Sequence, residues 1–332
     1  MNDYEVSLFA RSFSYQGDHV TGSIEQTHIS WVILTSAYAF KIKKPVKFNF
    51  LDFSTLALRQ YFCEKEVNLN KRLTDIYLSA EPVRKVNEIC SVGGDTGEII
   101  DYCVVMKRMS IAKRMDNQLK KGAVKEDVIL ALAQKIAHFH KHAIKVVLPF
   151  DLEKARNTFN DLSVIRPLGD SYFSVVNRAI ALSNDFLERH ASRIQQRINQ
   201  GLNRDVHGDL HAGNIFLYPD PVIFDCVEFN DQYRQIDVLY DIAFLCMDLD
   251  FFYQEHQKHL SEIFLAEYQS HFPAFQTTED HALFRYYKAL RANVRAKVYA
   301  IRIEQTKNKK EKLAYLNSIH RYLSMINHYL IN

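Results

Sequence analysis

The sequence predicts an α+β protein with a strand-rich N-terminal part and a larger, mainly helical C-terminal part. Residues 27–44 and 98–109 are rich in β-branched and aromatic side chains, which is typical of strands. Residues 125–143 repeat apolar side chains with a period near 3.6, and most of 171–200 and 238–332 does the same, which indicates helices. The strand patterns thus precede the helical ones instead of alternating with them.

The chain has 332 residues, which suggests two domains or lobes at about 100–200 residues each. The strand-rich part covers about the first 110 residues, and helical patterns dominate after it.

The N-terminal part contains two strands within 27–44, around a turn at Thr35-Ser36. A helix is predicted over 54–73, with Ser54 as its N-cap. The apolar residues Leu58, Phe62, Leu69 and Leu73 lie close to one face of this helix. Two further strands are predicted in 80–90 and 98–109, and the GGDTG turn joins them.

Composition excludes several classes of protein. The net charge is +3, from 42 basic and 39 acidic residues, which is too balanced to predict nucleic acid or a membrane surface as a partner. The five cysteines form no CxxC pair, and the N-terminus lacks a basic segment followed by an apolar run. We therefore expect reduced thiols, a cytoplasmic location and no signal peptide. No apolar run approaches the roughly 20 residues needed to span a bilayer.

One stretch, HGDLHAGNIF at 207–216, collects chemically active side chains inside the helical part. IFLY and VIF flank Pro219-Asp220-Pro221 just after it, which predicts an inserted β-hairpin. A hairpin returns the chain to its start, so Asp225 is expected to approach Asn214. Amide and carboxylate oxygens suit Mg²⁺, and Asp209 is placed to orient a hydroxyl nucleophile.

A zinc site is the less favoured interpretation of this stretch. His207 and His211 could bind zinc together with Asp209, but catalytic zinc needs three protein ligands and a water. A further histidine would have to come from a helix on which the candidates occupy different faces, namely His138, His140 and His142. A polar turn with capping roles is the third interpretation.

The order HGDLHxGN, hairpin, aspartate resembles the catalytic loop of aminoglycoside phosphotransferases, choline kinases and related small-molecule kinases. The stretches THISWV, AFKIKKPV, FLDFSTL and FDCVEFND resemble an uncharacterised bacterial branch of aminoglycoside-phosphotransferase-like proteins. The resemblance spans residues 27–250. It implies a bilobal protein kinase-like fold, with a nucleotide-binding lobe at 1–106, a hinge at 104–110, and a catalytic and substrate lobe at 107–332.

The resemblance also implies a set of ATP contacts in the first lobe. Tyr38-Ala39-Phe40-Lys41 resembles the strand whose lysine reaches nucleotide phosphates, and Lys43 on the same face is the alternative. Glu66, or else Glu64, would pair with that lysine. The backbone of Val105, Met106 and Lys107 would contact the adenine edge.

The implied function is ATP-dependent phosphoryl transfer to a hydroxyl group of a small molecule. Asn214 and Asp225 would bind Mg²⁺, and Asp209 would act on the acceptor hydroxyl. The sequence departs from the pattern because no glycine-rich loop precedes Lys41; THIS and TSAY stand there. A nucleotide-binding pseudokinase or regulatory module therefore stays open, as does an enzyme that transfers phosphate or AMP to protein.

The remaining polar residues are expected to have structural roles. We expect His207 to fix the loop, His140 to be buried beneath it, and Asp237 and Asp241 to brace it or cap a helix. Lys43, when not the phosphate-binding lysine, Lys44 and Lys47 are expected to be solvated. For Arg291 and Arg295, pairing with Asp241, Asp248 or Asp250 is favoured over binding an acidic substrate.

Overall fold

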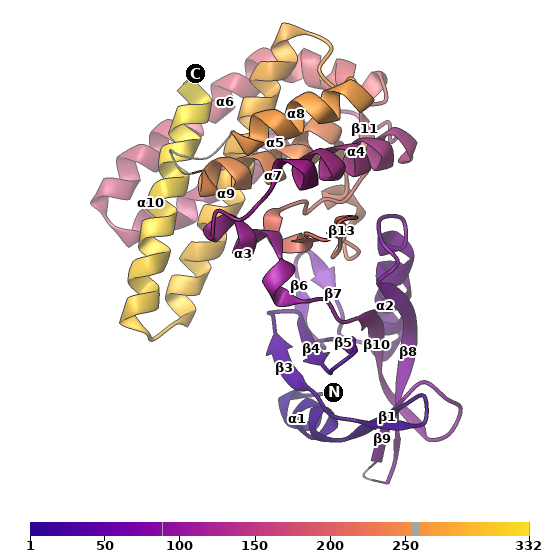
Figure 1. The fold of residues 1–332 in the computed structure, drawn as a ribbon. Coiled ribbons are helices and arrows are strands. Elements are labelled where there is room, and N and C mark those ends of the chain that lie inside the picture. The colour runs from indigo at the N-terminus through magenta and orange to yellow at the C-terminus, as the bar shows by residue number, and fades with distance from the viewer. Residues whose placement is uncertain (88, 254–258, 332) are drawn as a thin grey trace. The chain divides into compact units, whose positions relative to one another are not determined.

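The computed structural model describes residues 1–87, 89–253 and 259–331, and by its contacts the chain separates into two compact units (Figure 1). The first unit comprises Met1–Arg114, Asn214–Tyr218 and Val222–Tyr233, and the second comprises Met115–Gly213, Pro219–Pro221 and Arg234–Asn332. The predicted α+β class is confirmed. Residues 214–218 and 222–233 pack with the N-terminal strands, although the predicted boundary assigned them to the second lobe, because their contacts are distant in sequence.

The first unit is built on an eight-stranded sheet with the order β2-β1-β9-β8-β10-β5-β4-β3. Neighbouring strands are antiparallel except β1 and β9, which are parallel. The strands are β1 (Phe13–Tyr15), β2 (Asp18–Val20), β3 (Ser23–Gln26), β4 (Ser30–Leu34), β5 (Tyr38–Lys43), β8 (Tyr77–Val86), β9 (Ile89–Val92) and β10 (Glu98–Lys107). The two strands predicted within 27–44 are present as β4 and β5, and the strand predicted over 98–109 is present as β10. The single strand predicted over 80–90 was wrong, because β8 ends at Val86, Asn87 lies in a turn, and β9 begins at Ile89 and pairs back on β8. Glu88 lies outside the described residues.

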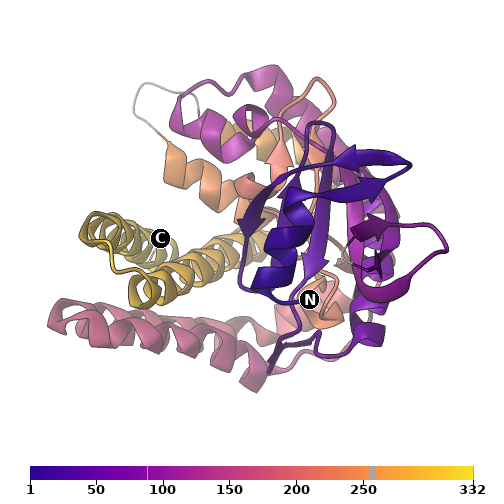
Figure 2. The same cartoon turned by 90° about the horizontal axis from the view of Figure 1, so that it is seen from below.

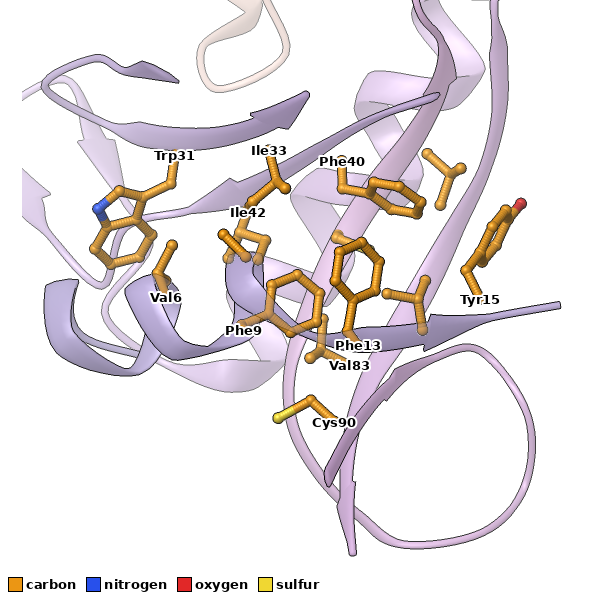
Figure 3. Close-up of a cluster of buried hydrophobic side chains, with 14 residues drawn as sticks. Val6, Phe9, Phe13, Tyr15, Trp31, Ile33, Phe40, Ile42, Val83 and Cys90 are labelled. Carbon is orange, nitrogen blue, oxygen red and sulfur yellow. The ribbon is translucent and has the colours of Figure 1, made fainter. Parts of the chain in front are cut away.

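Strand β5 separates two apolar clusters by the alternation of its side chains. Phe40 and Ile42 join a core with residues of helix α1 (Asp3–Arg11), including Val6 and Phe9 (Figure 3). Ala39 packs on the other face, against helix α2. Lys41 and Lys43 follow Ala39 at alternate positions, so they lie on the α2 face of the sheet.

Helix α2 extends over Leu56–Asn70, and its N-cap is Thr55, whose side chain accepts a hydrogen bond from Leu58 N at 3.2 Å. The prediction of Ser54 as N-cap was wrong by one residue. The buried side of α2 is mainly polar: Arg59, Cys63, Glu66, Val67 and Asn70. Its polar side chains have partners, as for Arg59 Nε, which lies 2.7 Å from Asp101 Oδ1. The apolar residues that share a face are half-buried at Leu58, Phe62 and Leu69, and Leu73, beyond the helix, is buried.

The second unit is mainly helical, and α9 and α10 run side by side as a helical hairpin (Figures 1 and 2). Its helices are α3 (Met115–Lys120), α4 (Glu126–His142), α5 (Leu152–Asn160), α6 (Asp170–Asn199), α7 (Val238–Phe252), α8 (Leu260–His271), α9 (Thr278–Gln305) and α10 (Lys309–Ile331). Residues 254–258 of the predicted helical stretch lie outside the described part. None of the described helices is both long and apolar enough to cross a membrane.

Three two-stranded sheets complete the fold. Two of them belong to the first unit: β6 (Lys47–Phe48) with β7 (Leu51–Asp52), and the hairpin of β12 (Ile215–Phe216) with β13 (Val222–Ile223). In the second unit, β11 (Asn203–Asp205) pairs with β14 (Gln235–Asp237). The predicted hairpin is thus confirmed at β12–β13.

Buried ion pairs connect three helices of the second unit. Arg197 on α6 contacts Asp237 (Nε to Oδ2, 2.6 Å) at the start of α7, and Asp280 (Nη1 to Oδ1, 3.0 Å) in the first turn of α9. Arg193 also contacts Asp280 at 2.8 Å. Burial by itself would raise the pKa of Asp280, but Arg193, backbone N–H donors and Arg197 lower it to about 2.

Replacing Asp280 by asparagine is expected to lower the free energy of unfolding by about 3 kcal/mol near neutral pH, since it leaves buried arginines without this partner. A carboxyl group with a depressed folded-state pKa stabilises the fold above its unfolded-state pKa and loses that effect as the pH falls through the folded-state pKa. The difference between wild type and variant should therefore shrink as the pH falls from about 4 towards 2. Urea unfolding across this range measures it, with Asp185→Asn, in an exposed pair with Arg189, as the control. A difference that does not change with pH would contradict this assignment.

Candidate functional site

The hairpin β12–β13 brings Asn214 next to Phe224, the residue before Asp225, although they are ten positions apart in the chain. Asn214 directly precedes β12, and its carbonyl oxygen accepts a hydrogen bond from Phe224 N at 3.1 Å. Asp225 comes next, with a φ of 63°, a left-handed conformation that aspartate and asparagine tolerate better than most residues. Its backbone N–H donates to Tyr77 Oη at 3.1 Å. The Asp225 side chain is 43% exposed, so a carboxylate reachable from solvent lies near an amide, a donor set that fits Mg²⁺.

Lys41 joins Asp225 to helix α2. Its Nζ atom lies 2.7 Å from Asp225 Oδ1 and 2.8 Å from Glu66 Oε1. Burial by itself would lower the pKa of Lys41, but Asp225 and Glu66 raise it well above its ordinary value. Burial likewise opposes ionisation of Glu66, yet Lys41 and Lys43 lower its pKa to about 2. Lys41 is thus a fixed cation beside the carboxylate that is predicted to bind the metal.

Lys43 is a fully buried member of the same cluster, so the expectation of a solvated lysine was wrong. Its Nζ atom lies 2.6 Å from Glu66 Oε2 and also contacts Glu228. The side chain lies on the α2 face of the sheet, and its charge has two carboxylate partners. Both candidate lysines therefore contact Glu66. Glu64, the alternative to Glu66, accepts a hydrogen bond from Gln60 instead.

Two residues that the sequence interpretation missed hold the segment after β13 against the N-terminal strands and α2. Asn70 is fully buried, and its Oδ1 accepts from Cys226 N at 2.9 Å while its Nδ2 donates to Glu66 O at 2.8 Å. Tyr77 holds Asp225 N as described above. Asn70 is the last residue of α2, where asparagine is common, so the sequence carried no signal of this role.

The predicted hinge, Val105 to Lys107, forms the end of strand β10. The backbone N–H of Lys107 donates to Ile76 O, and that of Arg108 donates to Ala37 O. Both N–H groups already have a carbonyl partner just outside the strands, so a base contacted at Lys107 would have to use its carbonyl oxygen. Adenine contact at Val105, Met106 and Lys107 stays a prediction.

Asp209 belongs to the second unit, in a loop shaped by two histidines. His207 Nδ1 accepts from Asp209 N at 3.2 Å, which is the loop-fixing role expected for His207. His211 Nδ1 accepts from Gly213 N at 2.9 Å, so the proton of a neutral ring lies on Nε2, which faces Asp209 Oδ2 at 3.4 Å. Burial opposes ionisation of Asp209, but His211, then His207 and Arg291, hold its pKa below the ordinary value. The carboxylate is 41% exposed and ionised.

Asp241 braces this loop from beneath. Its carboxylate accepts from His207 N at 3.2 Å and from Gly208 N at 2.9 Å. His140, fully buried on α4, lies 3.1 Å from the same carboxylate through Nε2. Asp237 caps α7 by accepting from Leu239 N at 2.8 Å. These are the structural roles expected for His140, Asp237 and Asp241.

Arg291 and Arg295 have different surroundings. Arg295 forms the expected pair with Asp248, at 3.9 Å. Arg291 is almost fully buried, donates to Tyr240 O at 3.2 Å and lies over the Tyr240 ring. Among the described residues, the structure shows Arg291 in no ion pair, so the expected pairing holds for Arg295 alone.

Zinc binding is not supported by the arrangement of ligands. No group of three or more histidine, cysteine, aspartate or glutamate side chains is placed to bind a metal within residues 1–87, 89–253 and 259–331. His140 is instead bonded to Asp241 and to Tyr268 Oη at 2.8 Å.

Comparison with known proteins agrees with this arrangement. Residues 63–287 match the model of the phosphotransferase enzyme family, which covers most of the chain. The chain belongs to this family. An uncharacterised protein of Mycobacterium tuberculosis and one of Mycobacterium bovis are each 32% identical to it over 296 residues. The match covers 86% of this chain and 56% of each relative, so the chain spans about half the length of these curated relatives.

Two solved structures are similar to this chain over nearly its whole length. A GDP complex of a variant of aminoglycoside 2'-phosphotransferase-IIIa has a TM-score of 0.55 at 13% identity, and the match covers 99% of this chain and 97% of that chain. Choline kinase from Cryptosporidium parvum Iowa II has a TM-score of 0.53 at 11% identity, with 94% and 91% covered. At such identities the likeness shows the protein kinase-like fold alone. The predicted family and fold are therefore confirmed.

Proposed function

We propose that this phosphotransferase transfers the γ-phosphate of ATP to a hydroxyl group of a small molecule. The supporting observation is the contact of one lysine, Lys41, with both Glu66 and Asp225, while Asn214 lies beside Asp225 in the hairpin. This is the set of groups that phosphoryl transfer requires: a cation for phosphate oxygens, an acidic partner that orients it, and oxygen ligands for Mg²⁺. The cytoplasm, where ATP is abundant, is the proposed location, and neither nucleic acid nor a membrane is proposed as a partner.

Each residue of the candidate site has a role in this proposal. Asn214 and Asp225 would hold Mg²⁺, which neutralises charge on the phosphate oxygens when bound. Lys41 turns from Asp225 to a phosphate oxygen while Glu66 keeps it in place. Asp209, ionised and held by His211, orients the acceptor hydroxyl and takes its proton late in the transfer. Positioning and charge neutralisation supply most of such catalysis.

The direct test is incubation with MgATP and a panel of hydroxyl-bearing metabolites, with mass spectrometry of ADP and of the phosphorylated product. A product heavier by one phosphoryl group, absent with Asp225→Asn, is the expected result. ADP formation that is the same with Asp225→Asn would contradict the proposed roles.

A nucleotide-binding pseudokinase is the second candidate, and one observation favours it. In the turn between β3 and β4, Thr27 Oγ1 accepts hydrogen bonds from Ile29 N at 3.3 Å and Ser30 N at 3.1 Å. These N–H groups have a protein acceptor, whereas a glycine-rich loop directs such groups at phosphate. Stabilisation by MgATP without turnover of any acceptor would favour this candidate. A mass increase of the protein itself after incubation with ATP would instead indicate protein modification.

Gly213 gives a further prediction for the catalytic loop. A Cβ atom at this position would lie 2.7 Å from His211 Cε1, so Gly213→Ala must displace the ring that contacts Asp209. We expect turnover to fall by about 10- to 100-fold, since small misplacement of a catalytic group is costly. In a His211→Ala background, Gly213→Ala should have little further effect, because the clash is gone. Equal losses in both backgrounds would contradict this explanation.

A further inference from the structure

Five charged side chains of the first unit form one continuous chain of ion pairs. Asp225 contacts Lys41, which contacts one oxygen of Glu66, and the other oxygen of Glu66 contacts Lys43. Lys43 then contacts Glu228, three residues after Asp225. Both ends of this charge chain lie in the segment after β13, and its middle lies on β5 and α2.

The inner part of the charge chain is sealed from solvent. The side chains of Lys43 and Glu66 are fully buried and that of Glu228 is 4% exposed, whereas Asp225 is 43% exposed. Leaving one partner of a buried pair unpaired costs several kcal/mol, so these contacts hold the segment, the strand and the helix firmly together. Two lysines against three carboxylates leave one excess negative charge, and the exposed end at Asp225 is where a cation can reach it.

The order of contacts gives Lys43 and Glu228 a specific task. If Lys41 were the only cation in contact with Glu66, this contact would weaken when Lys41 turns to a phosphate. Lys43 occupies the second oxygen of Glu66 and keeps that carboxylate oriented and ionised. Glu228 balances Lys43 and fixes the segment that carries Asp225.

We propose that Lys43 and Glu228 are positioning residues of the nucleotide site. They keep the side chains of Glu66 and Asp225 in place while Lys41 binds phosphate. The inference rests on the proposed function. Lys43 and Glu228 form a second lysine–glutamate pair beside Lys41 and Glu66. We infer that this second pair contributes to MgATP binding as well as to stability.

The test compares Glu228→Gln, Lys43→Met and the double variant. Binding of a non-hydrolysable β,γ-imido ATP analogue with Mg²⁺ is measured by titration calorimetry, and stability by thermal unfolding. Lys43→Met removes the ion-pair partner of buried Glu228, and Glu228→Gln removes one of the two carboxylate partners of buried Lys43. Both single variants should therefore be less stable than wild type. The double variant should regain part of that stability, because neither charge remains and a methionine can pack on the Phe53 ring that Lys43 now faces.

Binding of the analogue is the readout that separates positioning from support of the fold. It should stay about 10- to 100-fold weaker than wild type in the double variant, as for other residues that orient a metal site. Lys47→Met is the matched control, since Lys47 lies on the neighbouring β6 strand in a solvent-exposed pair with Asp52, and it should bind like wild type.

The outcomes distinguish the inference from the proposed function. Wild-type affinity in the double variant would overturn the inference alone. The inference would also be overturned if the double variant regained affinity for the analogue in proportion to the stability that it regains over the single variants. Failure of the wild-type protein to bind the analogue with Mg²⁺ would overturn the proposed function, and this inference with it.

Discussion

Replacing Asp209 by asparagine is expected to lower turnover by about 10²- to 10⁴-fold, the usual contribution of a positioned general base. Asparagine keeps the size of the side chain but cannot take the proton of the acceptor hydroxyl. The pKa of Asp209 is held below its ordinary value of 3.8, so the residue is an anion at every pH above about 4. Loss of activity between pH 4 and 7 should therefore not come from protonation of Asp209.

The affinity for MgATP is expected to stay within a few-fold of wild type in Asp209→Asn, because this residue acts on the acceptor. Steady-state turnover and nucleotide titration measure the two effects separately. Asp185→Asn, in an exposed pair with Arg189 of the same unit, is the control. Unchanged turnover with the true acceptor would remove Asp209 from the mechanism.

Replacing Asp225 by asparagine is expected to weaken Mg²⁺-dependent ATP binding by at least about 100-fold, and turnover with it. The change removes the exposed carboxylate but keeps a residue that tolerates the φ of 63° found there. The fold should therefore survive, which circular dichroism checks. In Asp225→Asn, adding Mg²⁺ should no longer strengthen ATP binding. In Asp209→Asn, Mg²⁺ should still strengthen it as in wild type.

The control for Asp225→Asn is Asp95→Asn, an exposed aspartate in the GGDTG turn of the same unit. The metal assignment would be contradicted if Mg²⁺ had no effect on ATP affinity in either wild type or Asp225→Asn.

The hairpin β12–β13 could be predicted from sequence because its residues lie close together in the chain. It places Phe224, the residue before Asp225, opposite Asn214, as the spacing of the two residues predicted. Alternation along 38–43 likewise predicted that Ala39 and Lys41 share a face. Local periodicity and turn chemistry are sufficient wherever the contacts are short in sequence.

Helix α2 shows why the rest could not be predicted. The apolar pattern drew attention to leucines and a phenylalanine on one face, yet the buried residues of the helix include Arg59, Glu66 and Asn70. Burial of such groups depends on partners far away in the chain, as with Glu66 and Lys43 or Asn70 and Cys226. Periodicity reports apolar faces and does not report polar pairs across long separations.

Helix α1 was missed for a different reason. Its sequence signal is the capping box of Asn2 and Glu5, in which Asn2 accepts from Glu5 N and Glu5 accepts from Asn2 N. Asparagine three residues before glutamate is a recognised start signal, but the helix is only nine residues long and its apolar face is short.

The central claim is that Lys41, held between Glu66 and Asp225, belongs to a site for a Mg²⁺-bound nucleotide. Calorimetric titration of ATP into wild type and Lys41→Met, each with and without Mg²⁺, tests it most directly. The account predicts binding to wild type that requires Mg²⁺, and a loss of at least about tenfold in affinity in Lys41→Met, since an ammonium–phosphate contact contributes about 1.5–3 kcal/mol. Equal affinity of the two proteins for MgATP, or no binding by wild type, would contradict it.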